Sequence, residues 1–83
     1  GPAAGEALLP ILPLLGDEQP LIRYLASEAI GAMGAAAKPA LQRLQERMQD
    51  SDPVVREAIA DAVASIESGT TVVTEPSAHE THP

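Results

Sequence analysis

The chain has 83 residues, contains no cysteine and carries a net charge of −7. A chain of this length forms one small domain, and the lack of cysteine excludes disulfides and thiolate metal sites. The acidic balance argues against nucleic acid and anionic membranes as partners, because both are bound through Lys and Arg. The longest apolar run, Ala7 to Leu15, is interrupted by prolines and is too short to span a membrane. Since no targeting signal is visible, we expect a cytoplasmic protein.

Helical spacing first occurs in residues 6–15, where apolar side chains recur every three or four positions. We predict a helix there, although Pro10 and Pro13 disfavour a regular helix interior. A second helix is predicted from about residue 20 to residue 33, with a proline at its first position. Its apolar residues come in adjacent pairs and end before Gly34, a natural left-handed stop. Such a wide stripe can contact two neighbours at once.

The second half of the chain repeats this order. Residues 35–49 are predicted to form a helix, and Asp52 is placed to cap a last helix over residues 53–67. The predicted inner stripe of the helix at 35–49 consists of Ala37, Leu41, Leu44 and Met48. We divide the chain into a leader at 1–5 that is typical of tag cleavage, a helical domain at 6–67, and a disordered acidic tail at 68–83.

One motif occurs twice, 33 residues apart. Asp17–Arg23 and Asp50–Arg56 both read Asp-x-x-Pro-apolar-apolar-Arg, and the match in apolar positions extends through the flanking helices. A fixed period of this kind indicates supersecondary units that bury their apolar faces by stacking on one another. We therefore predict an all-α fold, an α-solenoid-like stack of antiparallel helix pairs with about four helices in all.

The motif is followed by an Ala-rich helix, a turn containing Gly and the pattern Pro-x-Leu-x-x-Leu, and this combination resembles HEAT repeats. The short period looks more like the HEAT-like repeats of phycobilisome lyases than like the longer eukaryotic kind. The resemblance covers residues 6–67 and implies a structural ladder between repeats, in which Asp17 and Asp50 pair with Arg23 or Arg56. It also implies contact with another protein or another domain of the parent chain. Nothing in the sequence suggests bilin chemistry.

Three leucines of the first helix stand at positions that are polar in the second repeat. The first helix is therefore apolar nearly all round, which is typical of a helix that is covered on all sides. An upstream repeat, a second copy binding through residues 8–15, or a partner protein could cover it, and we favour the first. The residues expected at a partner contact are Leu9, Leu12, Leu14, Gln42, Gln45, Gln49, Val72 and Val73.

No catalytic or cofactor-binding group can be assembled from the sequence. Both histidines lie in the tail, no serine nucleophile has a neighbouring base, and no glycine-rich phosphate loop is present. His79 and His82 flank Glu80, but three ligands in a flexible tail make a weak metal site. We therefore expect no enzyme activity, no cofactor and no metal.

Three functions remain open. The first is a non-catalytic protein–protein interaction or docking module. In the second, residues 70–83 act as a short linear motif and the helices serve as its anchor; the β-branched run Thr70–Thr74 could add as a strand to a partner's sheet. The third is an accessory domain of a lyase-type enzyme, which the missing catalytic groups disfavour. Truncation at Ser68 separates the first two.

Overall fold

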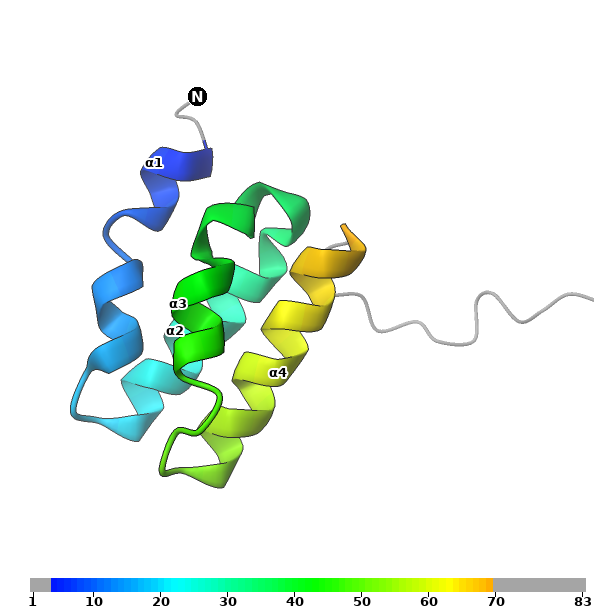
Figure 1. Cartoon of the computed structure of the whole chain (residues 1–83). Coiled ribbons are helices and arrows are strands. Elements are labelled where there is room, and N and C mark those ends of the chain that lie inside the picture. The colour runs from blue at the N-terminus through cyan, green and yellow to red at the C-terminus, as the bar shows by residue number, and fades with distance from the viewer. Residues whose placement is uncertain (1–3, 70–83) are drawn as a thin grey trace, which may run out of the picture.

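The computed structural model describes residues 4–69, and over this range the chain is helical throughout, with short turns (Figure 1). The predicted all-α class is therefore confirmed, whereas the predictions for the tail lie outside the described residues. Four α-helices and two 3₁₀ helices follow one another along the described chain. In order they are α1 (Ala4–Leu8), η1 (Leu12–Gly16), α2 (Pro20–Ala32), η2 (Gly34–Ala40), α3 (Leu41–Glu46) and α4 (Pro53–Ser68).

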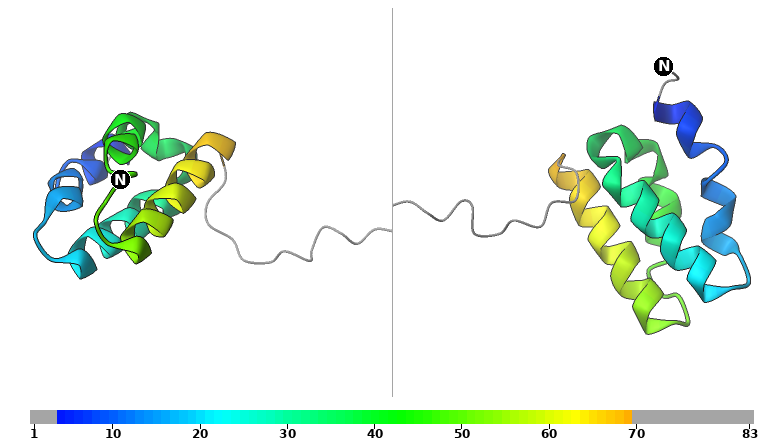
Figure 2. Two further views of the ribbon diagram at one scale, coloured as in Figure 1. Left: turned by 60° about the horizontal axis from the view of Figure 1, so that its bottom comes forward. Right: turned by 180° about the vertical axis from the view of Figure 1, so that it is seen from behind.

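The helices form two layers. The long helices α2 and α4 lie side by side in one layer, and the segments α1–η1 and η2–α3 form the other (Figures 1 and 2). Each segment of the second layer is followed along the chain by one of the long helices, so the described residues contain two stacked helix pairs. This arrangement is the predicted solenoid-like stack.

The boundaries of α2 and α4 follow from local chemistry. Each helix begins with a proline, whose missing N–H costs nothing at the first helical position. The side chain of Asp52 caps α4 by accepting hydrogen bonds from the N–H groups of Val54 at 2.8 Å and Val55 at 3.2 Å. Gly34, after α2, and Gly69, after α4, have φ angles of 60° and 80°, a left-handed conformation that glycine adopts without steric cost. The cap predicted at Asp52 and the stop predicted at Gly34 are present.

The two remaining predicted helices are not continuous, and this part of the sequence prediction was wrong. Residues 6–15 form the end of α1, a turn containing Pro10, and the 3₁₀ helix η1 with Pro13 near its start. Residues 35–49 are divided into η2 and α3, with Pro39 inside η2. A proline in a helix interior removes one hydrogen bond and clashes with the preceding turn, so the chain changes helix type at these positions.

The core lies between the two layers and is built from aliphatic side chains of every element. Ile30, Leu44, Ile59 and Ile66 are completely buried, and Leu8 and Leu15 are nearly so. Two parts of the predicted stripes are wrong. Met48 is 38% exposed, because α3 ends at Glu46 and the chain turns away from the core. Leu21 and Leu25 are 61% and 51% exposed, because the described residues place no helix against that side of α2.

A close contact sets the distance between the two long helices. Gly31 of α2 faces Ala62 of α4, and a Cβ atom added at Gly31 would lie 3.0 Å from the Cα of Ala62 and 3.1 Å from its Cβ. Real Cβ atoms rarely approach so closely, so a side chain at this position would push the helices apart. Gly31 thus allows α2 and α4 to pack at short distance.

Candidate functional site

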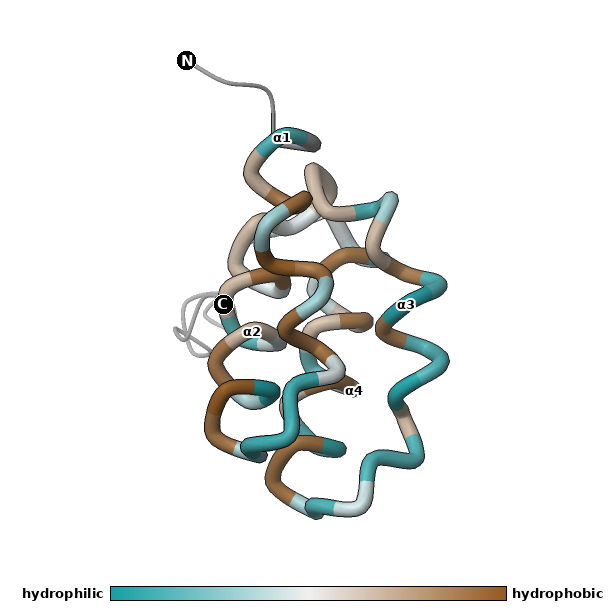
Figure 3. Tube along the Cα trace, turned by 90° about the vertical axis from the view of Figure 1, so that its left-hand side faces the viewer, coloured by the Kyte–Doolittle hydropathy of each residue, from teal (hydrophilic) through white to brown (hydrophobic). Residues whose placement is uncertain are grey.

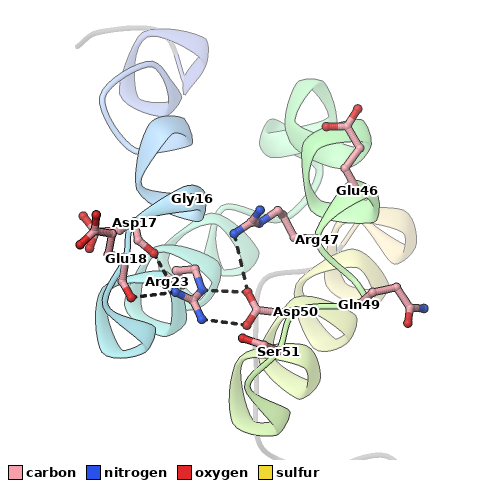
Figure 4. A pocket seen from close by; sticks show the side chains of 9 residues that line it. All are labelled: Gly16, Asp17, Glu18, Arg23, Glu46, Arg47, Gln49, Asp50 and Ser51. Carbon is pink, nitrogen blue, oxygen red and sulfur yellow. Dashed lines mark hydrogen bonds and ion pairs between the residues drawn. The ribbon is translucent and has the colours of Figure 1, made fainter.

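A buried ion pair joins the two repeats at the edge of the molecule where the turns before α2 and α4 lie (Figure 4). Arg23, in the first turn of α2, donates from Nε to Oδ2 of Asp50 at 2.8 Å and from Nη2 to Oδ1 at 3.0 Å. The guanidinium and the carboxylate therefore form a bidentate pair, the strongest geometry for these groups. Asp50 precedes α4, so this pair fixes the position of the second helix pair on the first.

The same guanidinium also holds its own turn. Nη1 of Arg23 donates to the backbone carbonyl oxygens of Asp17 at 2.7 Å and Glu18 at 3.2 Å. On the other side, Oδ1 of Asp50 accepts the backbone N–H of Asp52 at 2.9 Å, which shapes the turn before α4. One arginine and one aspartate thus organise both turns and the contact between them.

The protonation of the pair reflects these contacts. The hydrogen bonds from Arg23 hold the pKa of the Asp50 carboxyl below its ordinary value, and burial opposes this shift. The hydrogen bond to Asp50 likewise raises the pKa of Arg23. Both groups are therefore charged at neutral pH, and the pair adds no net charge to the surface.

Beside the ion pair lies a hollow of about 400 Å³ that is open to solvent and is lined by charged and polar residues of both turns (Figure 4). Arg47 borders it with its Nη2 3.9 Å from Oδ2 of Asp50, and its buried Nε atom has no hydrogen-bond partner. The hollow contains no serine–histidine or similar nucleophile–base pair. Within residues 4–69 no group of acidic residues or histidines is placed to hold a metal ion.

The four residues of the expected ladder occupy different environments. Asp50 and Arg23 form the bidentate pair. The carboxylate of Asp17 accepts the backbone N–H of Gln19 at 2.9 Å, and Arg56 donates from Nη1 to the carbonyl oxygen of Asp50 at 2.6 Å. Among the described residues neither Asp17 nor Arg56 is part of a carboxylate–guanidinium pair. Of the expected ladder, the described residues therefore contain one carboxylate–guanidinium pair, between Arg23 and Asp50.

The expected partner-contact residues also divide into groups. Leu9 and Leu14 are 67% and 39% exposed, whereas Leu12 is partly buried and packs against the core. Gln42, Gln45 and Gln49 all lie on the surface of the second repeat. Val72, Val73, His79, Glu80 and His82 lie outside the described residues.

Four of the six exposed large apolar side chains of the described residues belong to the first repeat, to the segment α1–η1 and to α2. Figure 3 shows the hydropathy along these elements and the more hydrophilic course of α3. We call Leu9, Leu14, Leu21 and Leu25 the leucine surface. Leu21 and Leu25 were not expected there, because they belong to the wide apolar stripe that was predicted to contact two neighbours at once. The 33-residue match contains one indication of this difference, because Leu25 corresponds to the much smaller Ala58 in the second repeat.

Two antiparallel helix pairs that stack on each other through an arginine–aspartate contact define an α-solenoid. The part of the chain that the structure describes contains no helix long and apolar enough to cross a membrane. A family model described as HEAT repeats matches residues 3–72, and the chain therefore belongs to the HEAT repeat family. No curated protein and no solved structure matches the chain. The resemblance to the phycobilisome-lyase type of repeat stays a prediction.

Proposed function

We propose that the chain is a non-catalytic protein–protein interaction module whose docking surface is the leucine surface of the first repeat. HEAT repeats are generally scaffolds for protein contacts, and this supports the general class. The observation that carries the specific proposal is the exposure of Leu9, Leu14, Leu21 and Leu25, each more than a third accessible to solvent. All four leucines belong to the first repeat, and exposed apolar side chains concentrated in one part of a small domain mark a contact site more often than scattered ones do.

The charge distribution supports the choice of this surface. The second repeat presents Gln42, Gln45 and Arg43 on α3, and its long helix α4 exposes Glu57, Asp61 and Glu67. A protein partner gains more free energy by covering leucine than by covering amides and carboxylates, which must be desolvated. The first repeat is therefore the better docking side. The cytoplasmic location that the sequence indicates stays a prediction.

The experiment is affinity capture with the whole chain, the double variant Leu9→Gln with Leu21→Gln, and the control Val54→Gln. Val54 occupies the position in α4 that Leu21 occupies in α2 and is 57% exposed, so its replacement changes a similar surface outside the docking side. We expect the double variant to lose captured proteins that the wild type and the control retain. Circular dichroism checks that the helices persist.

A chain truncated at Ser68 provides the second arm of the same experiment. Retained capture by the truncated chain supports the leucine surface. Loss of capture on truncation, with the double variant still active, would contradict the proposal and favour the docking motif in residues 70–83. Catalysis by the purified chain with a lyase substrate would contradict its non-catalytic part.

A further inference from the structure

The second arginine of the repeat motif is held like the first but lacks a carboxylate. Nη1 of Arg23 binds the carbonyl oxygen of Asp17, and Nη1 of Arg56 binds the carbonyl oxygen of Asp50, in both cases six residues earlier. This contact orients both guanidinium groups relative to their own turns. Arg23 then uses Nε and Nη2 to bind Asp50, whereas Arg56 is exposed and has no carboxylate partner among residues 4–69.

The opposite end of the molecule carries the matching acceptor. Asp17 corresponds to Asp50 in the motif, and Oδ1 of each accepts the backbone N–H two residues later at 2.9 Å. The turn at Asp17 therefore presents its carboxylate as the turn at Asp50 does. Asp50 receives Arg23 on this carboxylate, and Asp17 receives no arginine within the described residues.

The helix surfaces beside these two groups match in the same way. Gly31 of α2 faces Ala62 of α4, and Ser27 and Arg23, one and two turns before Gly31, are also buried. The corresponding positions of α4 are Ala64, Ala60 and Arg56, and all three are exposed. Ala62 of α4 and Ala58, one turn before it, are both buried, and the corresponding positions of α2 are Ala29 and Leu25, both exposed. The exposed surface of α4 therefore resembles the surface of α2 that contacts the second repeat, and the exposed surface of α2 resembles the surface of α4 that contacts the first. Within the described residues neither exposed surface has such a partner.

We propose that a second copy of the chain docks head to tail on the first, with Arg56 of one copy bound by the carboxylate of Asp17 in the next. Ala60 and Ala64 of the first copy then face Leu25 and Ala29 of the second, which covers part of the leucine surface. This inference rests on the proposed function of that surface and names its occupant. Charge complementarity supports it, since the two unpaired groups have opposite sign and lie at opposite ends of the stack.

The strength of the contact is limited by Ala64. Its counterpart Gly31 allows the close approach of Ala62, whereas Ala64 carries a Cβ atom at the corresponding position. Two copies therefore pack at a slightly greater distance than α2 and α4 do. Replacement of Ala64 by glycine should relieve this and tighten the association several-fold, a gain that a structural defect could not produce.

Analytical ultracentrifugation over a range of concentrations tests the proposal. We expect the whole chain to associate reversibly, and Arg56→Gln and Asp17→Asn each to weaken association by at least about tenfold. Arg43→Gln and Asp61→Asn make the same charge changes at exposed positions away from the two turns, and should associate like the wild type. Ala64→Leu, which blocks close approach without touching the charged groups, should abolish association.

A mixing experiment tests the head-to-tail direction. The Arg56→Gln chain keeps an intact Asp17 end, and the Asp17→Asn chain keeps an intact Arg56 end. An equimolar mixture should therefore form a heterodimer, although each variant alone is a monomer. A two-fold symmetric dimer would also regain one of its two reciprocal pairs on mixing, but it is a closed assembly. The wild type separates the two arrangements, because head-to-tail copies add further copies at each free end, whereas a two-fold dimer stops at two.

Several outcomes would overturn the proposal. These are a wild type that stays monomeric at millimolar concentration, a mixture that stays monomeric, or association that appears only after residues 70–83 are removed. The last result would identify those residues as the occupant of the free end. If captured proteins still depend on Leu9 and Leu21 in any of these cases, the proposed function stands and only the second copy is excluded.

Discussion

The two layers of the molecule solve the same packing problem with different helices. α2 and α4 are continuous over 13 and 16 residues, and each has its proline at the first position. The facing layer covers a similar length with two short α-helices and two 3₁₀ helices, because its prolines fall after the helix has started. The difference teaches that the position of a proline relative to the helix start, and not the number of prolines, decides continuity.

The layers also differ in how each residue contributes to stability. α4 buries six of its side chains, including Ile59 and Ile66, whereas α3 buries only Leu44 completely. The continuous layer, formed by α2 and α4, therefore holds most of the contacts between repeats. The interrupted layer, formed by α1–η1 and η2–α3, covers the core from the other side. Substitutions matched between the layers can test this division.

The largest effect is expected for Ile59→Ala in α4. Ile59 is completely buried, so the lost contacts and the cavity should lower the free energy of unfolding by about 2–5 kcal/mol. Met48→Ala, after α3, removes a side chain more than a third exposed and should cost less than about 1 kcal/mol. Urea denaturation of both variants measures the difference. Equal losses would contradict the division between the layers.

A smaller effect is expected where the continuous helices touch. Gly31→Ala places a Cβ atom against the backbone of Ala62 and should destabilise the protein by about 1–3 kcal/mol. Gly16→Ala is the control, because no atom lies within 4 Å of its added Cβ and its φ angle is not positive. Thermal melts should show a lowered midpoint for Gly31→Ala alone. A stabilised Gly31→Ala variant would mean that α2 and α4 can separate at no cost.

The ion pair between the repeats predicts a pH dependence. The pKa of Asp50 lies below its ordinary value of 3.8 in the folded protein, so its charged form contributes stability above that value. This contribution should decrease as the pH falls through the folded pKa. The free energy of unfolding of Asp50→Asn should therefore approach that of the wild type in acid and lie below it at neutral pH. Carboxyl groups ordinarily titrate within the range from about pH 2 to 7. A difference in the free energy of unfolding between the two proteins that stays constant over this range would contradict the prediction.

The smallest effect on stability is expected in the interrupted layer. Replacing Pro10 and Pro13 together by alanine restores two backbone donors and removes the steric conflict with the preceding turns. We expect α1 and η1 to merge, with a gain in helical circular dichroism equivalent to about one to two turns. The same replacement at Pro20 and Pro53 should leave helicity unchanged, because both residues occupy first helical positions. A similar gain at both pairs of sites would contradict the role of position.

Local chemistry was readable from the sequence, and contacts between helices were readable only in part. The cap at Asp52, the stop at Gly34 and the order of the helices follow from side chains and their immediate neighbours. The interruptions within residues 6–15 and 35–49 were not predicted, because both segments keep the apolar spacing of a helix on either side of their prolines.

The candidate site depends on placement, which the sequence does not contain. Leu25 and Ala58 occupy the same register of two similar helices, yet one is exposed and the other buried, because α4 has α2 on that side and α2 has no described neighbour. In the same way, the motif names Asp17, Arg23, Asp50 and Arg56 as possible partners. Only the stacking of the helix pairs shows that Arg23 meets Asp50.

The span of the ion pair along the chain has a consequence for insertions and deletions. Arg23 and Asp50 are 27 residues apart, and the segment between them contains most of α2, η2, α3 and the turn. A duplication of one whole 33-residue period reproduces a donor and an acceptor at the same separation. An insertion of another length within α2 or α3 shifts one of them around its helix and separates the pair. Relatives of this chain should therefore vary in length by whole periods or in the turns, and a library of random insertions should retain folded members at those places.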